Sequence, residues 1–367
     1  MPHLVVDISA HGFGHLVQTA AVLNALDPKN LRLTIRSTAP VSILQERIRW
    51  PFELISYQQD HGMLMLDALR VDVPKTFIWY QNFHANFPAR LAQAIADLEL
   101  LQADLLFTNV PYLSLAAAQR LNLPTIALCS LNWADIFQCY CGHLAGAAEI
   151  YTEILQIYQG VDSFLQPRPS MPMASLPRKK SIAPIASLGN KQPERLSAVT
   201  KGCFQQFVLV SLGGIGVRYP LETWPKLKGV AWIFDDHSLY IAREDFFPVS
   251  GFGLNYIDLL ASSDVVLTKT GYGTQTEAVV NQIPALCVQR GDWPEEPYLF
   301  AWHQKYGEVA FVDWAMIQSG GFIECLQRLL TTPWRKATVV PTGAQEAAHI
   351  IQQALYARTS PVYAVKP

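Results

Sequence analysis

The sequence predicts an α/β fold made of two Rossmann-like, doubly wound parallel-sheet domains. Short apolar runs alternate with helical segments along the chain, and parallel strands need such crossover connections between them. An apolar run followed by a glycine-containing turn opens each half, at residues 4–14 and again at residues 207–216. The length of 367 residues is too great for one typical core and suits two.

In the first half, apolar runs predict four strands, and apolar positions at helical spacing predict the segments between them. The predicted strands are Leu4–Ile8, Leu31–Ile35, Asp104–Thr108 and Thr125–Leu128. The predicted helices are residues 17–26, 41–48, 91–101 and 113–121.

Between Gln166 and Pro193 prolines and serines replace the periodic pattern. We therefore expect a first domain at 1–175, a linker at 176–200 and a second domain at 201–340. The strands predicted in the second domain are Phe207–Ser211, Trp232–Phe234, Leu239–Ala242, Val265–Thr268 and Ala285–Val288. A last helix, Gly343–Ala357, is predicted within a C-terminal segment at 341–367, and its packing back on the first domain is left open.

The composition excludes several classes of protein. Half of the residues are hydrophobic and 16% are charged, which supplies a large core, and the net charge of −2 leaves no electrostatic footprint for nucleic acid. The N-terminus has no secretory signal pattern and no apolar run approaches a transmembrane length of roughly 20 residues, so a cytoplasmic location is expected. The six cysteines are scattered, and the single C-x-C pair, Cys139 and Cys141, favours free thiols over a zinc site.

The segment Gly271–Glu277 joins a glycine turn to the start of a helix, directly after a predicted strand. Glycine lets the backbone approach an anion, and a helix start offers unpaired N–H groups with a favourable dipole. Glu277 is placed to accept the hydroxyls of a ribose, and an ordinary helix N-cap is the alternative. The candidate donor-binding residues here are Gly271, Tyr272, Gly273, Thr274, Gln275 and Glu277, with the hydroxyl of Thr276 as a further donor.

A second glycine loop, Ser211–Gly216, follows the first strand of the second half. Gly213 and Gly214 are candidate contacts to a bound phosphate. The loop has neither the Walker lysine nor G-x-G-x-x-G spacing, and a tight strand-to-helix turn explains it equally well.

A turn with two histidines, Ala10–His15, follows the first predicted strand. Open α/β sheets bind ligands at the carboxyl ends of their strands, and histidine is a common catalytic base. His15 is therefore the candidate base, and Gly14 is a candidate donor contact. Asp135, after the strand Thr125–Cys129, is the alternative catalytic carboxylate. Packing or capping roles remain open for these side chains.

Two adjacent carboxylates, Glu295 and Glu296, follow the last predicted strand of the second domain. They are candidates for hydrogen bonds to sugar hydroxyls, with solvated loop charges as the alternative. Asp235-Asp236-His237 is interpreted as an acidic turn rather than a metal motif.

These segments, in this order, resemble the two-domain GT-B class of nucleotide-sugar glycosyltransferases. Gly271–Glu277 and Ser211–Gly216 look like the donor turn and glycine loop of the N-acetylglucosaminyl transferases that make lipid II. Most of residues 1–330 is more similar still to the glycosyltransferase-like N-terminal portion of plant L-arabinokinases. The stretches that carry this likeness are Gly12–His15, Asp67–Asp72, Leu131–Ile136, Tyr256–Glu277 and Arg290–Pro297.

The resemblance implies two domains facing a cleft, with the donor on the second and the acceptor on the first. It implies a metal-independent glycosyltransferase with no required cofactor, which moves a sugar from a nucleotide sugar, by preference a UDP-sugar, to an unknown hydroxyl acceptor. In the family, the glutamate that matches Glu277 contacts the ribose. Relatives carry Asn-Ala where Leu299 and Phe300 stand here. Inversion is expected, because His303 and Gln304 stand where a retaining enzyme often has a second glutamate.

Other functions stay open at this stage. The same fold serves nucleotide-sugar hydrolases and 2-epimerases, and it can serve a non-catalytic nucleotide-sugar-binding module. A Rossmann dehydrogenase is disfavoured, because no G-x-G-x-x-G follows the first strand.

Overall fold

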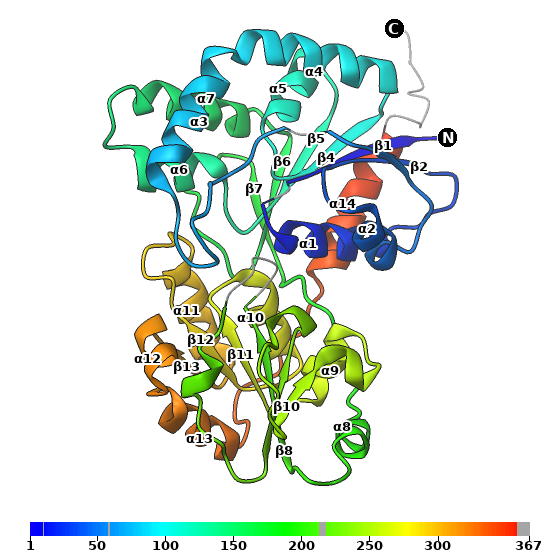
Figure 1. Ribbon diagram of the computed structural model, residues 1–367. Helices are drawn as coiled ribbons and strands as arrows, with labels where there is room; N and C mark the ends of the chain where they lie inside the picture. The colour runs from blue at the N-terminus through cyan, green and yellow to red at the C-terminus, as the bar shows by residue number, and fades with distance from the viewer. Residues whose placement is uncertain (10, 58, 213–217, 358–367) are drawn as a thin grey trace, which may run out of the picture. The chain divides into compact units, whose positions relative to one another are not determined.

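The computed structural model describes residues 1–9, 11–57, 59–212 and 218–357. The chain forms two compact units, and each is an α/β unit built on a parallel sheet (Figure 1). The first unit comprises Met1–Leu64, Asp72–Ile185 and the chain from Thr342 onward. The second comprises Met65–Val71 and Ala186–Pro341. The predicted fold class is therefore confirmed.

The first unit is built on a seven-stranded parallel sheet of order β3-β2-β1-β4-β5-β6-β7. Because β2 and β3 lie on one side of β1 and β4 lies on the other, the strand order reverses between β1 and β4. The strands are β1 (His3–Ile8), β2 (Arg32–Arg36), β3 (Glu53–Ile55), β4 (Leu105–Asn109), β5 (Thr125–Leu128), β6 (Ser163–Pro167) and β7 (Lys179–Ile182). The helices are α1 (Phe13–Asn24), α2 (Val41–Arg47), α3 (Val73–Ala85), α4 (Phe87–Leu101), α5 (Leu113–Arg120), α6 (Trp133–Cys141), α7 (Ala147–Gln159) and α14 (Gly343–Ala357).

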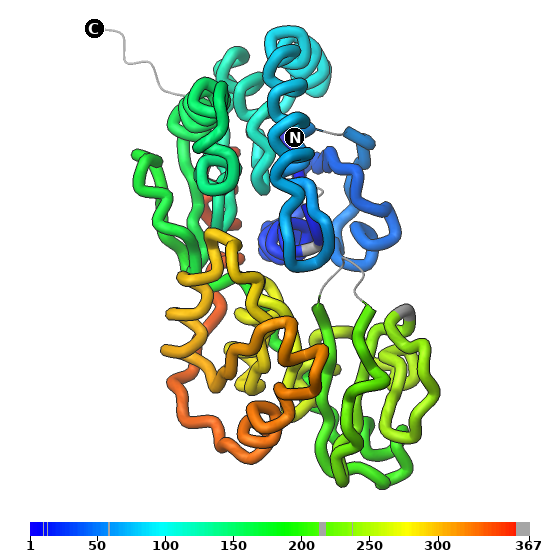
Figure 2. The backbone as a smooth tube through the Cα atoms, turned by 60° about the vertical axis from the view of Figure 1, so that its left-hand side comes forward, coloured from blue at the N-terminus to red at the C-terminus, as the bar shows by residue number. Residues whose placement is uncertain are grey.

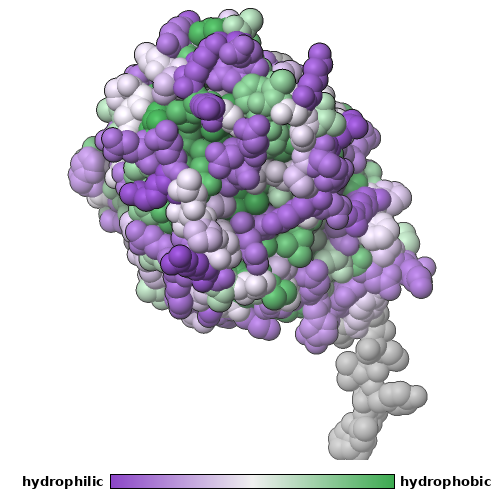
Figure 3. Space-filling view, turned by 90° about the horizontal axis from the view of Figure 1, so that it is seen from below, coloured by the Kyte–Doolittle hydropathy of each residue, from purple (hydrophilic) through white to green (hydrophobic). Residues whose placement is uncertain are grey.

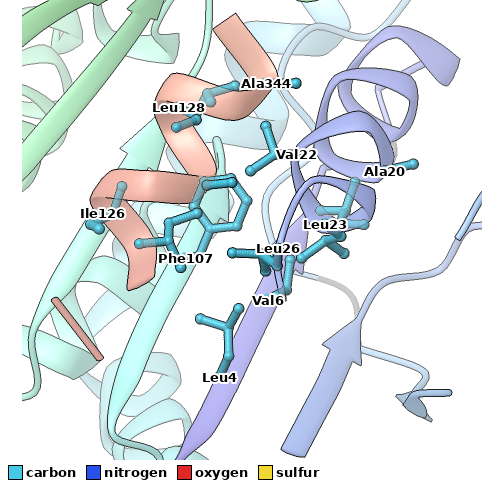
Figure 4. Packing of buried hydrophobic residues seen from close by; sticks show 14 of the residues in the cluster. Leu4, Val6, Ala20, Val22, Leu23, Leu26, Phe107, Ile126, Leu128 and Ala344 are labelled. Carbon is cyan, nitrogen blue, oxygen red and sulfur yellow. The ribbon is translucent and has the colours of Figure 1, made fainter. Parts of the chain in front are cut away.

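The main core of the first unit lies between one face of its sheet and the helices α1 and α14. Figure 4 shows Val6 and Phe107 of the strands among Val22 and Leu23 of α1, with Ala344 of α14 beside them. The last helix thus lies along strands that are distant from it in sequence (Figures 1 and 2). The prediction of a helix at Gly343–Ala357 is confirmed in its bounds.

The second unit is built on a six-stranded parallel sheet of order β10-β9-β8-β11-β12-β13. Its strand order reverses between β8 and β11. The strands are β8 (Gln206–Ser211), β9 (Val230–Phe234), β10 (Phe246–Pro248), β11 (Val265–Lys269), β12 (Ala285–Val288) and β13 (Val309–Val312). The helices are α8 (Pro193–Val199), α9 (Tyr256–Ser262), α10 (Tyr272–Val280), α11 (Glu296–Tyr306), α12 (Trp314–Ser319) and α13 (Ile323–Thr331), with short 3-10 turns at Leu221–Thr223, Asp236–Ser238 and Val249–Phe252.

The predicted strand Leu239–Ala242 is wrong. The edge strand beside β9 is β10, where Phe246 pairs with Trp232. Side-chain bonds hold the predicted segment in an irregular path, because the Tyr240 hydroxyl donates to the Tyr219 carbonyl at 2.5 Å. An apolar run can therefore pack against a core without joining its sheet.

The segment 176–200 differs from the linker that was expected there. It contains β7 and α8, and the chain passes from the first unit to the second after Ile185. Lys179, Lys180 and Ser181 of β7 are exposed. Charged residues are usual on an edge strand, and they remove the apolar pattern by which a strand is predicted from sequence.

The surface gives no single broad apolar region on the face shown in Figure 3, where hydrophobic residues are scattered among hydrophilic ones. Within the described part of the chain, no helix is both long enough and apolar enough to cross a membrane. None of the six cysteines, all of which lie among the described residues, is joined in a disulfide.

Candidate functional site

The glycine turn of the second unit lies at the point where its strand order reverses. β11 ends at Lys269, Gly271 is the N-cap of α10, and β11 pairs with β8. Ligands of open α/β sheets bind outside the carboxyl ends of the strands at such a reversal. The structure therefore places the predicted turn where a nucleotide is most often held in this class of sheet.

The space over this turn is open. A Cβ atom built on Gly271 or Gly273 would meet no other atom within 4 Å. Gly271, the N-cap of α10, has no side chain to bond the amides of the first turn, which begins at Tyr272. The first amides of a helix have no partners within the helix, so this open helix start is suited to an anion.

Hydroxyl groups and one carboxylate line the base of the turn. The Thr274 hydroxyl lies 3.4 Å from the Tyr256 hydroxyl, which also bonds the side chain of Ser211 at the end of β8. Burial raises the pKa of Tyr256 to about 12, and the nearby Glu277 carboxylate adds to that shift. Glu277 is 6% exposed. Neutral hydroxyl groups therefore link the turn after β11 to the end of β8.

The hydroxyl of Thr276 is not available to a ligand at the turn. Its hydroxyl donates back into α10, to the carbonyls of Tyr272 at 2.8 Å and Gly273 at 2.9 Å. The expectation that it adds a hydroxyl donor for a ligand is wrong, because its only hydrogen is engaged within the helix.

Two cations that the sequence reading passed over flank the turn. Lys269 at the end of β11 donates to the carbonyl of Ala68 at 3.1 Å, and Arg290 after β12 donates to that of Leu69 at 3.3 Å. Burial lowers the pKa of Lys269 to about 8, and the charge of Arg290 lowers it further. The sequence could have indicated both residues, because each stands at or just after the end of a predicted strand, beside the candidate turn or on the neighbouring strand.

Glu295 and Glu296 are buried in the loop that starts α11. Both carboxylate oxygens of Glu296 accept loop amides, from Arg290 at 2.7 Å and Gly291 at 3.1 Å. Glu295 accepts from the indole of Trp293 at 3.2 Å. These bonds shape the loop, and contact with a sugar stays a prediction for both residues.

The other glycine loop of the second unit is described only at its start. Ser211 and Leu212 end the described segment, while Gly213 and Gly214 lie outside the described residues.

In the first unit, His15 lies beside the reversal between β1 and β4. It is the third residue of α1, after Gly12, whose φ of +77° favours glycine. Its Nδ1 lies 2.8 Å from Oδ1 of Asn109, the last residue of β4. Gly14 leaves open space, since a Cβ there would meet nothing within 4 Å. The rings of His11 and Trp133 lie next to the imidazole.

Asn109 fixes which nitrogen of His15 is free to act as a base. Its amide nitrogen donates to the His15 carbonyl at 3.2 Å and to Oε1 of Gln18 at 3.1 Å, so its oxygen faces the imidazole. An amide oxygen only accepts, so Nδ1 carries the proton and Nε2 has the lone pair. Burial lowers the pKa of His15, and the bond with Asn109 offsets part of that effect. The imidazole is therefore neutral at neutral pH.

Asp135, the alternative catalytic carboxylate, lies in the first turn of α6. It bonds Asn132, the N-cap of α6, through its amide at 2.8 Å and its carboxylate at 2.9 Å. Burial raises its pKa. These bonds tie the carboxylate to the start of the helix, and a catalytic role for Asp135 stays a prediction.

The sequence reading missed a buried carboxyl group, Asp60, in a small pocket at the same edge of the first sheet. Oδ2 of Asp60 accepts the amide of Tyr112 at 2.7 Å. Burial raises the pKa of this carboxyl to about 7. The pocket is lined by Ile8, Ser9, Thr38, Tyr57, Gln59, Asp60, His61 and Pro111.

Within the ranges that the structure describes, no group of three or more His, Cys, Asp and Glu side chains is gathered as a metal site. Asp236 accepts the amide of Ser250 at 3.1 Å, as an acidic turn does.

Solved glycosyltransferases share this fold, although no protein-family model matches the chain. The glycosyltransferase of kitacinnamycin is 14% identical, with a TM-score of 0.64 over 97% of this chain and 95% of that one. A UDP-glucosyltransferase from Polygonum tinctorium is 12% identical, with a TM-score of 0.60 over 98% and 95%. The spinosyn rhamnosyltransferase SpnG, solved with thymidine diphosphate, is 15% identical, with a TM-score of 0.56 over 97% and 96%. The chain has the GT-B fold of these enzymes.

A more specific likeness is to a plant protein, the L-arabinokinase of Arabidopsis thaliana. The two are 22% identical over an alignment of 373 residues, which covers 96% of this chain and 34% of the plant protein. The chain thus spans about a third of the length of that relative. The resemblance expected from the sequence motifs is confirmed.

Proposed function

We propose that this chain is a glycosyltransferase that moves a sugar from a nucleotide-diphosphate sugar, by preference a UDP-sugar, to a hydroxyl of an acceptor. One observation carries the proposal: an unobstructed glycine turn and helix start stand at the strand reversal of the second sheet. The shared fold of a UDP-glucosyltransferase and of a transferase solved with thymidine diphosphate supports it.

In this proposal the start of α10 holds the diphosphate. Its amides and dipole favour an anion, and the charges of Lys269 and Arg290 add to the positive potential. Gly273 and Thr274 contact phosphate, while Glu277 accepts hydroxyls of the ribose. Because these groups neutralise the departing diphosphate, transfer is proposed to need no metal ion.

His15 is the proposed base. Nε2 takes the proton of the acceptor hydroxyl as its oxygen bonds the anomeric carbon, and the bond to the diphosphate breaks with its electron pair on the phosphate oxygen. Attack opposite the leaving group inverts the anomeric centre. A general base of this kind contributes about 10²–10⁴-fold to the rate.

Release of UDP from UDP-sugars, measured alone and with a panel of hydroxyl acceptors, tests the proposal. Transfer predicts UDP release that depends on the acceptor and persists in EDTA. Release without any acceptor would instead identify a hydrolase or epimerase. Binding without turnover across the panel would identify a nucleotide-sugar-binding module.

A further inference from the structure

Two fully buried polar side chains lie behind the donor turn. Gln275 of α10 and His303 of α11 are both 0% exposed. Oε1 of Gln275 accepts the amide of Gly271 at 3.0 Å, and Nε2 of Gln275 lies 3.0 Å from Nδ1 of His303. A single hydrogen-bonded bridge therefore runs from the backbone of the turn to the neighbouring helix.

The bond at Gly271 determines which atom donates in the bond between Gln275 and His303. Because Oε1 of Gln275 takes the amide of Gly271, Nε2 has to donate to Nδ1 of His303. The imidazole is then neutral, with its proton on Nε2. Burial lowers the pKa of His303 to about 3, so this form persists at neutral pH.

The imidazole is also held tightly in its place. A Cβ on Gly307 would lie 2.5 Å from Cδ2 and 2.8 Å from Nε2 of His303, so the ring packs directly on the glycine backbone. Nε2 finds no hydrogen-bond partner there among the described residues. A buried donor without a partner costs stability, and a leucine of similar volume would only move that cost to Nε2 of Gln275, which would lose its acceptor. The presence of histidine therefore points to a role for its Nδ1.

We propose that His303 is a positioning residue for the donor turn. By accepting from Nε2 of Gln275, it fixes the end of the amide that faces Gly271, and so holds the turn in the shape that receives a nucleotide diphosphate. An amide flip would set two donors against each other at Gly271. The inference rests on the proposed function, because the ligand it serves is the diphosphate of the donor.

Calorimetric titration with UDP tests the role of His303. His303→Leu should weaken UDP binding about tenfold, the effect of one net hydrogen bond, without lowering Tm. His303→Asn keeps an acceptor near the position of Nδ1 and should recover most of that affinity. As a control, Leu329→Ala shortens a core residue of α13 that is 5% exposed, and it should lower Tm while leaving the UDP affinity unchanged.

A double-mutant cycle guards against a purely structural explanation. Gln275→Leu breaks the same bridge from the other side, so it and the double variant should each show the same loss of about tenfold. An additive loss of about a hundredfold, or unchanged UDP binding by His303→Leu, overturns the positioning role. If the unaltered protein binds neither UDP, TDP nor GDP, the proposed function fails and this inference falls with it.

Discussion

Alanine in place of Gly273 should change stability and ligand binding in opposite directions. The new methyl group meets no protein atom within 4 Å, and the residue lies in the first turn of α10. Alanine is better than glycine in a helix by about 0.5–1 kcal/mol. For a unit of this size, that gain raises Tm by about 1–4 °C.

The same methyl group would occupy the open side of the turn over which the diphosphate has to approach. We expect Gly273→Ala to lose at least about tenfold in UDP affinity, or about 1.4 kcal/mol, by calorimetric titration. Thr152→Ala on the exposed face of α7 is the control, because it gains helix propensity in the first unit, which does not carry the turn, and it should bind UDP normally. Unchanged UDP affinity in Gly273→Ala would refute the proposed grip on the diphosphate.

Four further predictions concern single side chains. His15→Ala should lower the rate of transfer about 10²–10⁴-fold while keeping the UDP affinity, and an unchanged rate would exclude His15 as the base. Asn109→Leu removes the bond that holds the imidazole and should lower the rate about tenfold. Lys269 loses its charge above its pKa of about 8, so UDP affinity should fall as the pH rises from about 7 to about 9, and Lys269→Met should remove that step. The carboxyl of Asp60 has a pKa of about 7, above its ordinary 3.8, so the folded state holds its proton more tightly. As the pH rises from about 4 to about 8, the free energy of unfolding of the unaltered protein, measured in urea, should fall by about 1–4 kcal/mol relative to that of Asp60→Asn.

Features that depend on neighbouring residues could be predicted from the sequence. The strand, glycine turn and helix around Gly271 form one continuous pattern, and so does the helix Gly343–Ala357. β7 escaped prediction because Lys179 and Lys180 face solvent at the edge of the sheet. Local periodicity is informative only where one face of an element is buried.

The partners of the candidate residues depend on contacts between distant segments. Asn109 is 94 residues from His15, and only the register of β1 against β4, which pairs Ile8 with Asn109, brings it there. Nothing in the sequence shows that the carboxylate of Glu296, a predicted sugar contact, also accepts two loop amides. Such bonds are set by tertiary packing, which no short motif records.

A thermal-shift screen of the unaltered protein with UDP, TDP and GDP tests the central claim most directly. A ligand that binds only the folded state stabilises it by about 2.7 kcal/mol at a hundred times its Kd, which is a rise in Tm of about 5–10 °C for a unit of this size. The proposed donor site predicts such a rise with UDP, and a rise of about half that size or less in Gly273→Ala at the same UDP concentration. No change in Tm with any of the three nucleotides would contradict it.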